Sequence, residues 1–328
     1  MNRRDTVLVI LALGTAPLVS VAQQPAKVWR VGYLDYGSRQ SIVDSGKHAA
    51  LMQGLLDFGY VEGRNMVIEE RYADGKPDRA HALAAELVGQ KVDLILTSGS
   101  PTSKAAQQAT ATIPIVIVTI ADPVGEGVTV SLARPGGNIT GMSTGGADTL
   151  QKLVELLGAA SPGLKRIAVL TNPTTGTHVS NLSRVQAAAN TTGKQVVPVS
   201  ARTPAEIERV FATMARERAD ALVIPIDGFM YQQRAQIAAL ALKHRLPSIY
   251  PTAGYAEAGG LMSYGADIND NARRAGYFVD KILKGAKPSD IPFEQPTRYY
   301  LVVNRKTANA IGIKLSNELL LRATKVIE

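Results

Sequence analysis

Small hydroxyl residues and a proline follow one apolar run in a pattern suited to binding an anion. The run Leu94-Ile95-Leu96 leads into residues 98–103, Ser-Gly-Ser-Pro-Thr-Ser. Proline favours the first turn of a helix, where free backbone N–H groups attract negative charge. This stretch therefore predicts a carboxylate site with Ser98, Ser100 and Thr102 as its contacts, although Ser100 would equally serve as an ordinary N-cap without any ligand.

Two carboxylates follow apolar runs in a similar way. Asp227 comes shortly after Leu222-Val223-Ile224, where it would pair with a ligand ammonium or, alternatively, cap a helix that begins near Met230. Asp122, directly before a proline, would contact a ligand or cap a short helix around Val128 to Leu132. For each acid the sequence leaves both alternatives open.

The other candidate ligand contacts are polar or aromatic side chains at the ends of predicted strands, namely Tyr36, Thr119, Asn172 and Tyr250. The chain holds 11 Tyr against 5 Phe and 1 Trp. Tyrosine offers an apolar ring with a polar tip, which suits the wall of a wet cleft. Together with the acids and the hydroxyl loop, these residues predict recognition of a small charged molecule with an apolar body.

Patterns typical of enzymes and cofactor sites are missing from the sequence. It contains no Walker A motif, no Gly-x-Ser-x-Gly elbow, no His-Glu-x-x-His motif and no dinucleotide fingerprint. The absence of cysteine excludes disulfides and thiolate metal sites, and the 4 histidines are too scattered to predict a metal centre. We therefore expect a binding protein without catalytic residues, metal or cofactor.

Length and charge limit the remaining classes of protein. With 328 residues, of which 45% are hydrophobic and 20% charged, the chain has a globular composition and exceeds one small core. The net charge of +8 comes from Lys and Arg residues spread along the chain without a long basic run. We therefore expect two lobes and no nucleic-acid partner.

Short apolar, β-rich runs alternate with segments of helical spacing, such as Leu51, Leu55 and Phe58. This alternation predicts an α/β protein whose parallel sheets are covered by helices on both faces. Ligands of such sheets bind beyond the carboxyl ends of the strands, where the candidate residues lie. The predicted strands are residues 28–34, 66–69, 92–97, 113–118, 167–170, 195–199, 221–226 and 246–250.

A repeated unit predicts that the two lobes are similar. Residues 92–116 and 219–249 each place Asp before an apolar strand and Pro in the next strand, although any two βαβ units can look alike by chance. We expect two doubly wound parallel-sheet lobes joined by a hinge, with Gly136, Gly137 and Gly265 at the crossings. The predicted lobes are residues 23–141 plus 265–328, and residues 142–264.

The N-terminus has the pattern of a secretory signal peptide. Arg3 and Arg4 precede a short apolar run, and Ser20-Val21-Ala22 offers a cleavage site before Gln23. The run is too short to span a bilayer, and a buried N-terminal helix is the alternative. We expect residues 1–22 to be removed and the mature protein to lie in the periplasm without a lipid anchor, since there is no cysteine to carry one.

Four sets of residues, in order along the chain, resemble one known family. They are Gly59-Tyr60-Val61-Glu62-Gly63-Arg64-Asn65; residues 122–125 (DPVG) with 131–141 (SLARPGGNITG); Ser263-Tyr264-Gly265; and residues 303–308 (VNRKTA) with Gly312. Over nearly the whole mature chain the sequence is similar to the ABC-transporter substrate-binding proteins, whose characterised relatives include tryptophan and tyrosine binders.

The resemblance implies a type I periplasmic binding protein fold with three crossing segments and a cleft that closes on its ligand. By position, residues 98–102, Thr119, Asp122, Asn172 and Asp227 match the cleft-lining loops of that family. It also implies delivery of the solute to an ABC permease with a cytoplasmic ATPase. We therefore expect a monomer that captures a small organic solute, either amino-acid-like or an aromatic carboxylate. The alternative is a ligand sensor that docks on a chemoreceptor or sensor kinase.

Overall fold

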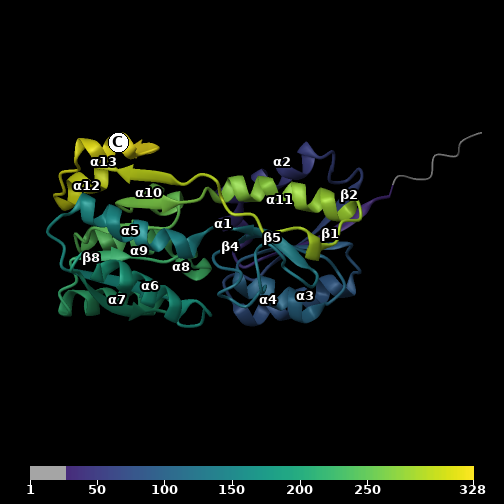
Figure 1. The fold of residues 1–328 in the computed structure, drawn as a ribbon, viewed down its shortest axis with the longest axis horizontal. Coiled ribbons are helices and arrows are strands. Elements are labelled where there is room, and N and C mark those ends of the chain that lie inside the picture. The colour runs from purple at the N-terminus through teal and green to yellow at the C-terminus, as the bar shows by residue number, and fades with distance from the viewer. Residues whose placement is uncertain (1–26) are drawn as a thin grey trace, which may run out of the picture.

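The computed structural model describes residues 27–328, apart from the side chains of residues 147 and 148, and the predicted signal peptide lies outside this range. Two α/β lobes lie side by side along the long axis of the molecule (Figure 1). Each lobe is built on its own sheet, as the repeated unit in the sequence predicts. No helix in the part of the chain described has the length and apolar character needed to cross a bilayer.

The sheet of the first lobe has five parallel strands in the order β2-β1-β3-β4-β5. The central strands are buried on both faces, which explains their continuous apolar runs. The strands are β1 (Trp29–Asp35), β2 (Met66–Tyr72), β3 (Leu94–Ser98), β4 (Ile115–Ile120) and β5 (Ile139–Ser143).

Helices cover both faces of this sheet. Leu94 and Leu96 point to the face that α2 (Lys47–Asp57) and α11 (Ile268–Leu283) cover, whereas Ile95 points to the face under α3 (Pro77–Gly89) and α4 (Ser100–Ala109). The pairs α2–α11 and α3–α4 lie above and below the sheet in Figure 1. A short helix, α1 (Arg39–Asp44), follows β1.

The sheet of the second lobe has seven strands in the order β12-β11-β10-β9-β8-β6-β7, all parallel except for the antiparallel pair β10–β11. Its strands are β6 (Arg166–Thr171), β7 (Gln195–Ser200), β8 (Ala221–Val223), β9 (Ser248–Tyr250), β10 (Met262–Gly265), β11 (Tyr300–Asn304) and β12 (Lys325–Ile327). Its helices are α5 (Gly146–Ala160), α6 (His178–Asn190), α7 (Pro204–Arg216), α8 (Gly228–Gln232), α9 (Arg234–Lys243), α10 (Ala253–Glu257), α12 (Arg305–Ile311) and α13 (Asn317–Arg322).

The two aspartates of the repeated unit occupy equivalent places in the two lobes. The Asp93 carboxylate accepts a hydrogen bond from the Arg30 backbone N–H (2.8 Å) at the start of β1. The Asp220 carboxylate accepts one from the Arg166 backbone N–H (2.9 Å) at the start of β6. Each aspartate thus ties the entry of one strand to the entry of its neighbour, so the repeat has the same structural role in both lobes.

The chain crosses between the lobes three times, around residues 144–146, 266–267 and 291–299. The first and third segments are joined, because the Ser143 backbone N–H donates to the Glu294 carbonyl (2.8 Å). The turn at Gly136 and Gly137 precedes the first crossing instead of forming it, since β5 pairs with β4 in the first sheet. Gly265 ends β10, directly before the second crossing.

The predicted lobe boundary at residue 265 needs one correction. Helix α11 packs on the first lobe as expected, but residues 300–328 do not return there with it. Strand β11 pairs antiparallel with β10, from Met262 with Val303 to Gly265 with Tyr300, and β12 extends the same sheet. Assigning residues 300–328 to the first lobe was therefore wrong, because their strands complete the second sheet.

Two glycines allow α2 and α11 to touch through their backbones. A β-carbon on Gly54 would overlap the Arg273 carbonyl of α11, and one on Gly276 would overlap the Gly54 carbonyl of α2. No side chain separates the helices at this crossing, which allows α11 to seat closely after the second crossing.

We predict that Gly276→Ala lowers the free energy of unfolding by about 1–3 kcal/mol, because the added methyl forces two helix backbones apart. Chemical denaturation followed by circular dichroism measures this change. The matched control is Gly89→Ala at the exposed end of α3, where a β-carbon meets nothing within 4 Å. Gly89→Ala should be neutral or stabilising, and equal effects at the two sites would contradict the packing argument.

Candidate ligand-binding cleft

A cavity of about 370 Å³ lies between the lobes, at the carboxyl ends of the strands of both sheets. This volume suits a small organic molecule. Among the nine predicted contacts, the cavity is lined by Tyr36, Ser98, Ser100, Thr119, Asn172 and Asp227. The other three, Thr102, Asp122 and Tyr250, are placed elsewhere, for reasons that their hydrogen bonds and packing make plain.

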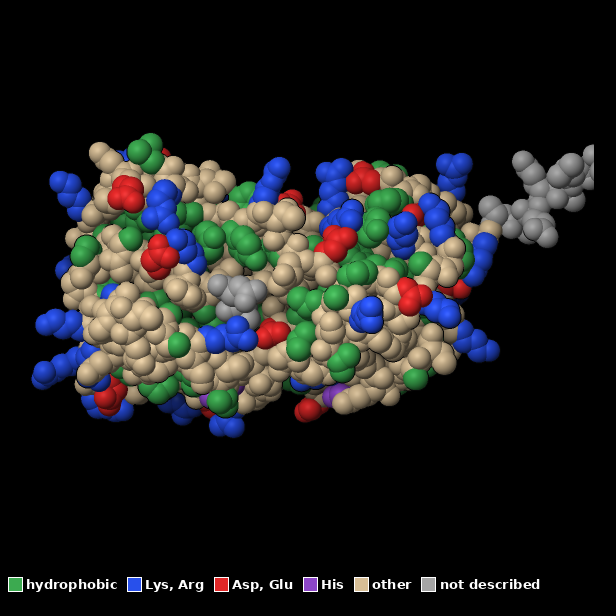
Figure 2. Space-filling view, in the orientation of Figure 1, with side chains coloured by type: hydrophobic (Ala, Val, Ile, Leu, Met, Phe, Trp, Pro, Cys, Tyr) green, Lys and Arg blue, Asp and Glu red, His purple; other side chains and the backbone are tan. Residues whose placement is uncertain are grey.

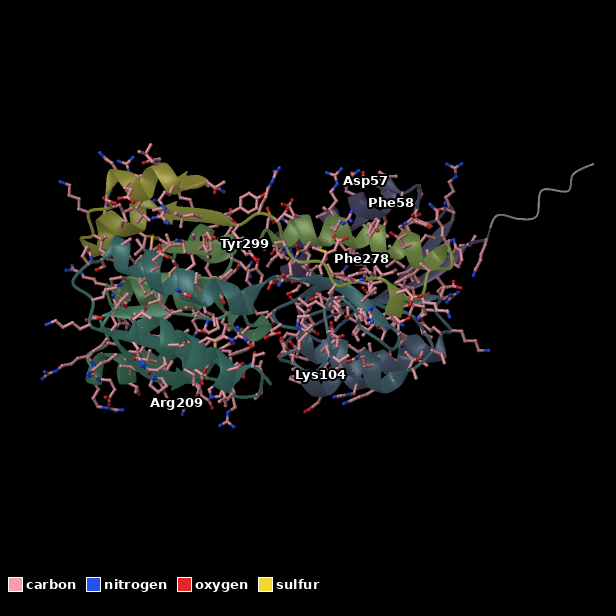
Figure 3. All side chains as sticks on the ribbon, viewed as in Figure 1. Asp57, Phe58, Lys104, Arg209, Phe278 and Tyr299 are labelled. Atoms are coloured by element: carbon pink, nitrogen blue, oxygen red, sulfur yellow. The ribbon has the colours of Figure 1, made fainter. Side chains whose placement is uncertain are left out.

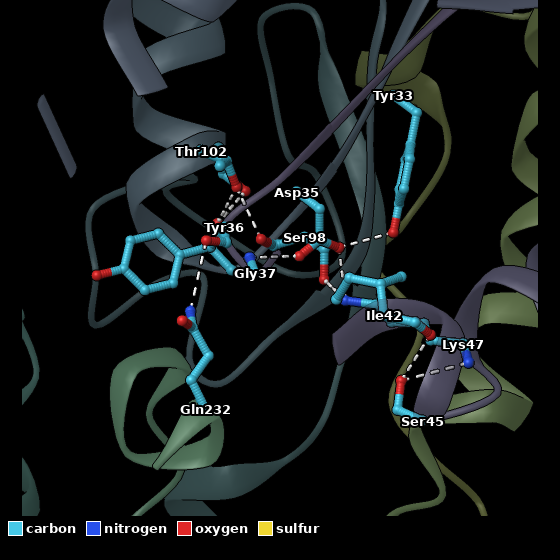
Figure 4. A network of polar contacts seen from close by, with 12 residues as sticks. Tyr33, Asp35, Tyr36, Gly37, Ile42, Ser45, Lys47, Ser98, Thr102 and Gln232 are labelled. Carbon is cyan, nitrogen blue, oxygen red and sulfur yellow. Dashed lines mark hydrogen bonds and ion pairs between the residues drawn. The ribbon is translucent and has the colours of Figure 1, made fainter. Parts of the chain in front are cut away.

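A buried ion pair forms the floor of the cleft in the first lobe (Figure 4). Lys47 Nζ lies 2.5 Å from Asp35 Oδ2, and the two residues are 7% and 2% exposed. The Tyr33 hydroxyl donates to the same carboxylate oxygen (2.7 Å), and the Gly37 backbone N–H donates to the other (2.8 Å). Burial, followed by the Asp35 charge, raises the pKa of Tyr33 well above its usual value. The carboxylate therefore holds β1 and the start of α2 together.

The same lysine orients a predicted ligand contact. Lys47 Nζ donates to Ser98 Oγ (3.0 Å), which leaves the Ser98 O–H to donate into the cleft that it lines. Sequence reasoning missed Lys47 and its pairing with Asp35, because Lys47 lies in no motif and twelve residues separate the two. Only the fold shows that the end of β1 meets the start of α2.

The hydroxyl loop begins helix α4, but Gly99 is its N-cap instead of Ser100. Gly99 has φ +89°, a conformation that a glycine adopts without strain, and Ser100 is the first helical residue. The Thr102 hydroxyl donates to the carbonyls of Ser98 (2.7 Å) and Gly99 (3.0 Å). Because Thr102 is fully buried in these bonds, its side chain stabilises the turn and does not line the cleft.

Asp122 lies at the edge of the cleft, where it forms a turn and a link between the lobes. Its carboxylate accepts a hydrogen bond from the Gly125 backbone N–H (2.8 Å). Its other oxygen lies 3.6 Å from the guanidinium of Arg184, on α6 of the second lobe. The expected short helix around Val128 to Leu132 is absent, since turns at residues 123–127 lead into bends and irregular loop over residues 128–132. Asp122 therefore caps a turn and pairs across the cleft edge.

In the second lobe, Asp227 is both a cap and a wall residue. One carboxylate oxygen accepts a hydrogen bond from the Met230 backbone N–H (2.8 Å) at the start of α8, as the capping alternative predicts. The other lies 3.4 Å from the side-chain nitrogen of Asn172, which also lines the cleft. Burial raises the pKa of Asp227 above its usual value. Each oxygen thus already faces a donor of the protein.

Aromatic residues form the rest of the second-lobe wall, but with a different tyrosine from the one predicted. Tyr250 is buried beneath Tyr255, with ring centroids 4.6 Å apart and nearly parallel planes, so Tyr255 faces the cleft in its place. Tyr231 meets Tyr255 edge-on at 5.9 Å and also lines the cleft. The strand-end position of Tyr250 predicts an aromatic wall, but the rings that face the cleft belong to Tyr255 on α10 and Tyr231 on α8.

Tyr36 reaches from the first lobe toward the second. Its hydroxyl donates to the Gly75 carbonyl (2.7 Å), and its ring lies against Gly228 at the start of α8. The Gln232 side chain donates to the Tyr36 carbonyl (3.4 Å), as Figure 4 shows. Burial, and then the Asp227 charge, raise the pKa of Tyr36 to about 12. The tyrosine therefore remains neutral while it covers one side of the cleft.

Two further charged residues line the cleft and were not singled out from the sequence, Glu126 and Lys104. Glu126 lies just after the DPVG segment, and Lys104 lies one turn into α4. The sequence signal for both was their closeness to loops already identified. Across residues 27–328, no three histidine or acidic side chains come together in a way that could hold a metal ion.

Comparison with known proteins agrees with this geometry. Residues 43–327 match the model of the ABC transporter substrate binding protein family. The chain belongs to this family. Its two parallel-sheet lobes have the type I periplasmic binding protein fold. The family accounts for a cleft built from the strand ends of both lobes.

Three relatives illustrate this membership. A tyrosine-binding protein of Clostridioides difficile (strain R20291) is 26% identical over 80% of this chain and 75% of its own length. A Streptococcus pneumonia domain solved in complex with L-Trp has a TM-score of 0.85 at 26% identity, covering 92% of this chain and 100% of the domain. A Clostridium difficile substrate binding protein with adhesive properties, solved ligand-free and open, has a TM-score of 0.67 at 26% identity, covering 92% and 99%.

We predict that Lys47→Ala lowers the free energy of unfolding by about 3–5 kcal/mol, because it leaves the buried Asp35 carboxylate without its cation. The control is Lys152→Ala, which removes the exposed ion pair with Glu155 and should cost less than about 1 kcal/mol. Urea denaturation of both variants measures the difference. A Lys47→Ala cost as small as that of the control would show that the pair does not hold the cleft floor.

Proposed function

We propose that this protein is the periplasmic solute-binding component of an ABC importer. The observation that carries the proposal is the cavity between the lobes, with polar side chains from both walls turned toward it. A ligand in such a site touches both lobes, and its binding energy favours the closed arrangement. Closure then marks the loaded protein for a membrane permease, which passes the solute on with the energy of a cytoplasmic ATPase.

The proposed solute is a small organic molecule, either amino-acid-like or an aromatic carboxylate. The tyrosines of the wall suit an aromatic body, and the hydroxyl loop with the free N–H groups at the start of α4 suits a charged end. The names of the relatives, one tyrosine-binding and one solved with L-Trp, support this choice. Of the predicted contacts, Ser98, Ser100 and Thr119 would serve the first lobe and Asn172 and Asp227 the second.

We also propose where the protein acts and in which oligomeric state. The predicted signal peptide would deliver the protein to the periplasm, where it would act as a monomer that binds solute without turning it over. On the face shown in Figure 2, Lys and Arg side chains are interspersed with Asp and Glu over both lobes. This distribution supports a soluble carrier without a nucleic-acid partner.

The first test is a thermal-shift screen over amino acids, aromatic acids, nucleosides and sugars. A bound ligand stabilises by mass action, by about 2.7 kcal/mol at a hundred times its dissociation constant. We expect the melting temperature to rise with amino acids or aromatic acids. A rise with none of the solutes in the panel would contradict solute binding of this class.

A second test concerns closure at the three crossings. The structure has the higher TM-score with the L-Trp complex (0.85) than with the ligand-free, open relative (0.67), at the same 26% identity. Contacts across the cleft edges, such as Asp122 with Arg184, also support a closed arrangement. Small-angle scattering should therefore show a smaller radius of gyration with ligand than without it. An unchanged profile at saturation would contradict hinge closure.

A further inference from the structure

One buried carboxylate in the cleft lacks a hydrogen-bond partner. Glu126 is 5% exposed and lines the cavity, yet its Oε2 atom meets no donor in the described part of the protein. Buried polar atoms are almost always hydrogen-bonded, since leaving one unpaired costs free energy. A buried carboxyl oxygen held in this state needs an explanation beyond packing.

The surroundings of Glu126 compensate its charge only in part. Burial, and to a smaller extent the Asp122 charge, raise the pKa of Glu126 and together outweigh the Ser100 hydroxyl, a backbone hydrogen bond from Asp122 and the Lys104 ammonium, which lower it. Lys104, labelled in Figure 3 near the end of its lobe that faces the second lobe, makes no ion pair within 4 Å among residues 27–328. Its Nζ instead approaches Gly176 of the second lobe. The negative charge of an ionised Glu126 is therefore only partly balanced by the protein groups around it.

The position of Glu126 alters the chemistry of the α4 start. The carboxyl lies close to Ser100, the first residue of that helix, so the positive end of the helix already faces an anion of the protein. A ligand carboxylate placed there would meet this like charge. A positively charged group on the ligand would be attracted to it.

The opposite wall also presents polar atoms without partners. Tyr255 Oη and Thr252 Oγ1 are buried and unpaired, and both residues line the cavity from the second lobe. By contrast, both oxygens of Asp227 face donors of the protein, Met230 N–H and the Asn172 side chain. Of these two acids in the cleft, only Glu126 has a carboxyl oxygen without a donor among residues 27–328.

We infer that Glu126 is a ligand-binding residue, whose Oε2 accepts a hydrogen bond from a positively charged nitrogen of the solute. This inference rests on the proposed solute-binding function and narrows its ligand class. The cleft should prefer amines and amino acids with an aromatic body over the corresponding acids that lack the amine. Glu126 thus acts as a specificity-determining residue. The ligand ammonium is then bound by Glu126 in the first lobe, and not by Asp227 in the second lobe.

Removing the charge of Glu126 should affect the stability of the free protein and its binding of amines in opposite ways. Glu126→Gln keeps the shape of the side chain but removes the buried charge, so the ligand-free variant should melt at the same or a higher temperature. The same change should weaken binding of an amine by about 10- to 100-fold, the range for a hydrogen bond to a charged group. A merely structural glutamate would show the reverse, a loss of stability without a change in selectivity.

The experiment is titration calorimetry with L-tryptophan, tryptamine and indole-3-propionate. The wild-type protein should bind the two amines more tightly than the acid, and Glu126→Gln should abolish that preference by weakening the amines alone. Asp280→Asn is the matched control, because it changes a buried carboxylate outside the cleft that pairs with Lys284. That control should keep both affinity and preference.

Four results would overturn the inference. Three concern variants: an amine preference that survives Glu126→Gln, a loss of all three ligands alike in that variant, and a preference that Asp227→Asn removes instead. The fourth is wild-type binding of indole-3-propionate without either amine, which would leave the proposed function intact. A wild-type protein that binds no solute in the thermal-shift panel would instead contradict the proposed function itself.

Discussion

The ion pair between Asp35 and Lys47 is the interaction on which most of the cleft depends. It joins the last residue of β1 to the first residue of α2, and both side chains are almost completely buried. Through Lys47 it orients Ser98, and through the Gly37 N–H it shapes the loop that carries Tyr36. Helix α2 in turn receives α11, so the pair also fixes where the chain returns from the second lobe. A buried pair is costly to break because either charge alone remains stranded.

Two groups of buried polar side chains in the cleft differ in whether they have hydrogen-bond partners. Around Asp35, the buried charges have partners: a lysine, a tyrosine hydroxyl and a backbone N–H. One buried polar atom each of Glu126, Thr252 and Tyr255 has no such partner within residues 27–328. The first group holds the site in shape, and the second leaves hydrogen-bonding capacity to something that enters it. This division is the usual compromise between stability and binding.

The sequence predicts the fold well because its strongest signals are local. Strands such as Leu94–Ser98 are continuous apolar runs, and the loops after them carry the polar residues that face the cleft. What it misses depends on contacts between distant segments. Nothing near Tyr300 indicates an antiparallel partner in β10, and nothing near Lys47 indicates Asp35. The choice between Tyr250 and Tyr255 depends on which ring covers the other, which a strand-end position does not specify.

The path of the chain has a consequence for synthesis. A growing chain makes all five strands of the first sheet by Ser143, but only one of the two helices that cover the face of Leu94 and Leu96, α2, is made by then, and α11 (Ile268–Leu283) follows much later. The second sheet also waits, because β11 and β12 come from residues 300–327. Neither lobe can bury its full core until nearly the whole chain has left the ribosome, whereas a domain made of one continuous segment folds as it emerges. Because segments of each lobe come late in the sequence, neither hydrophobic core can be completed early in synthesis.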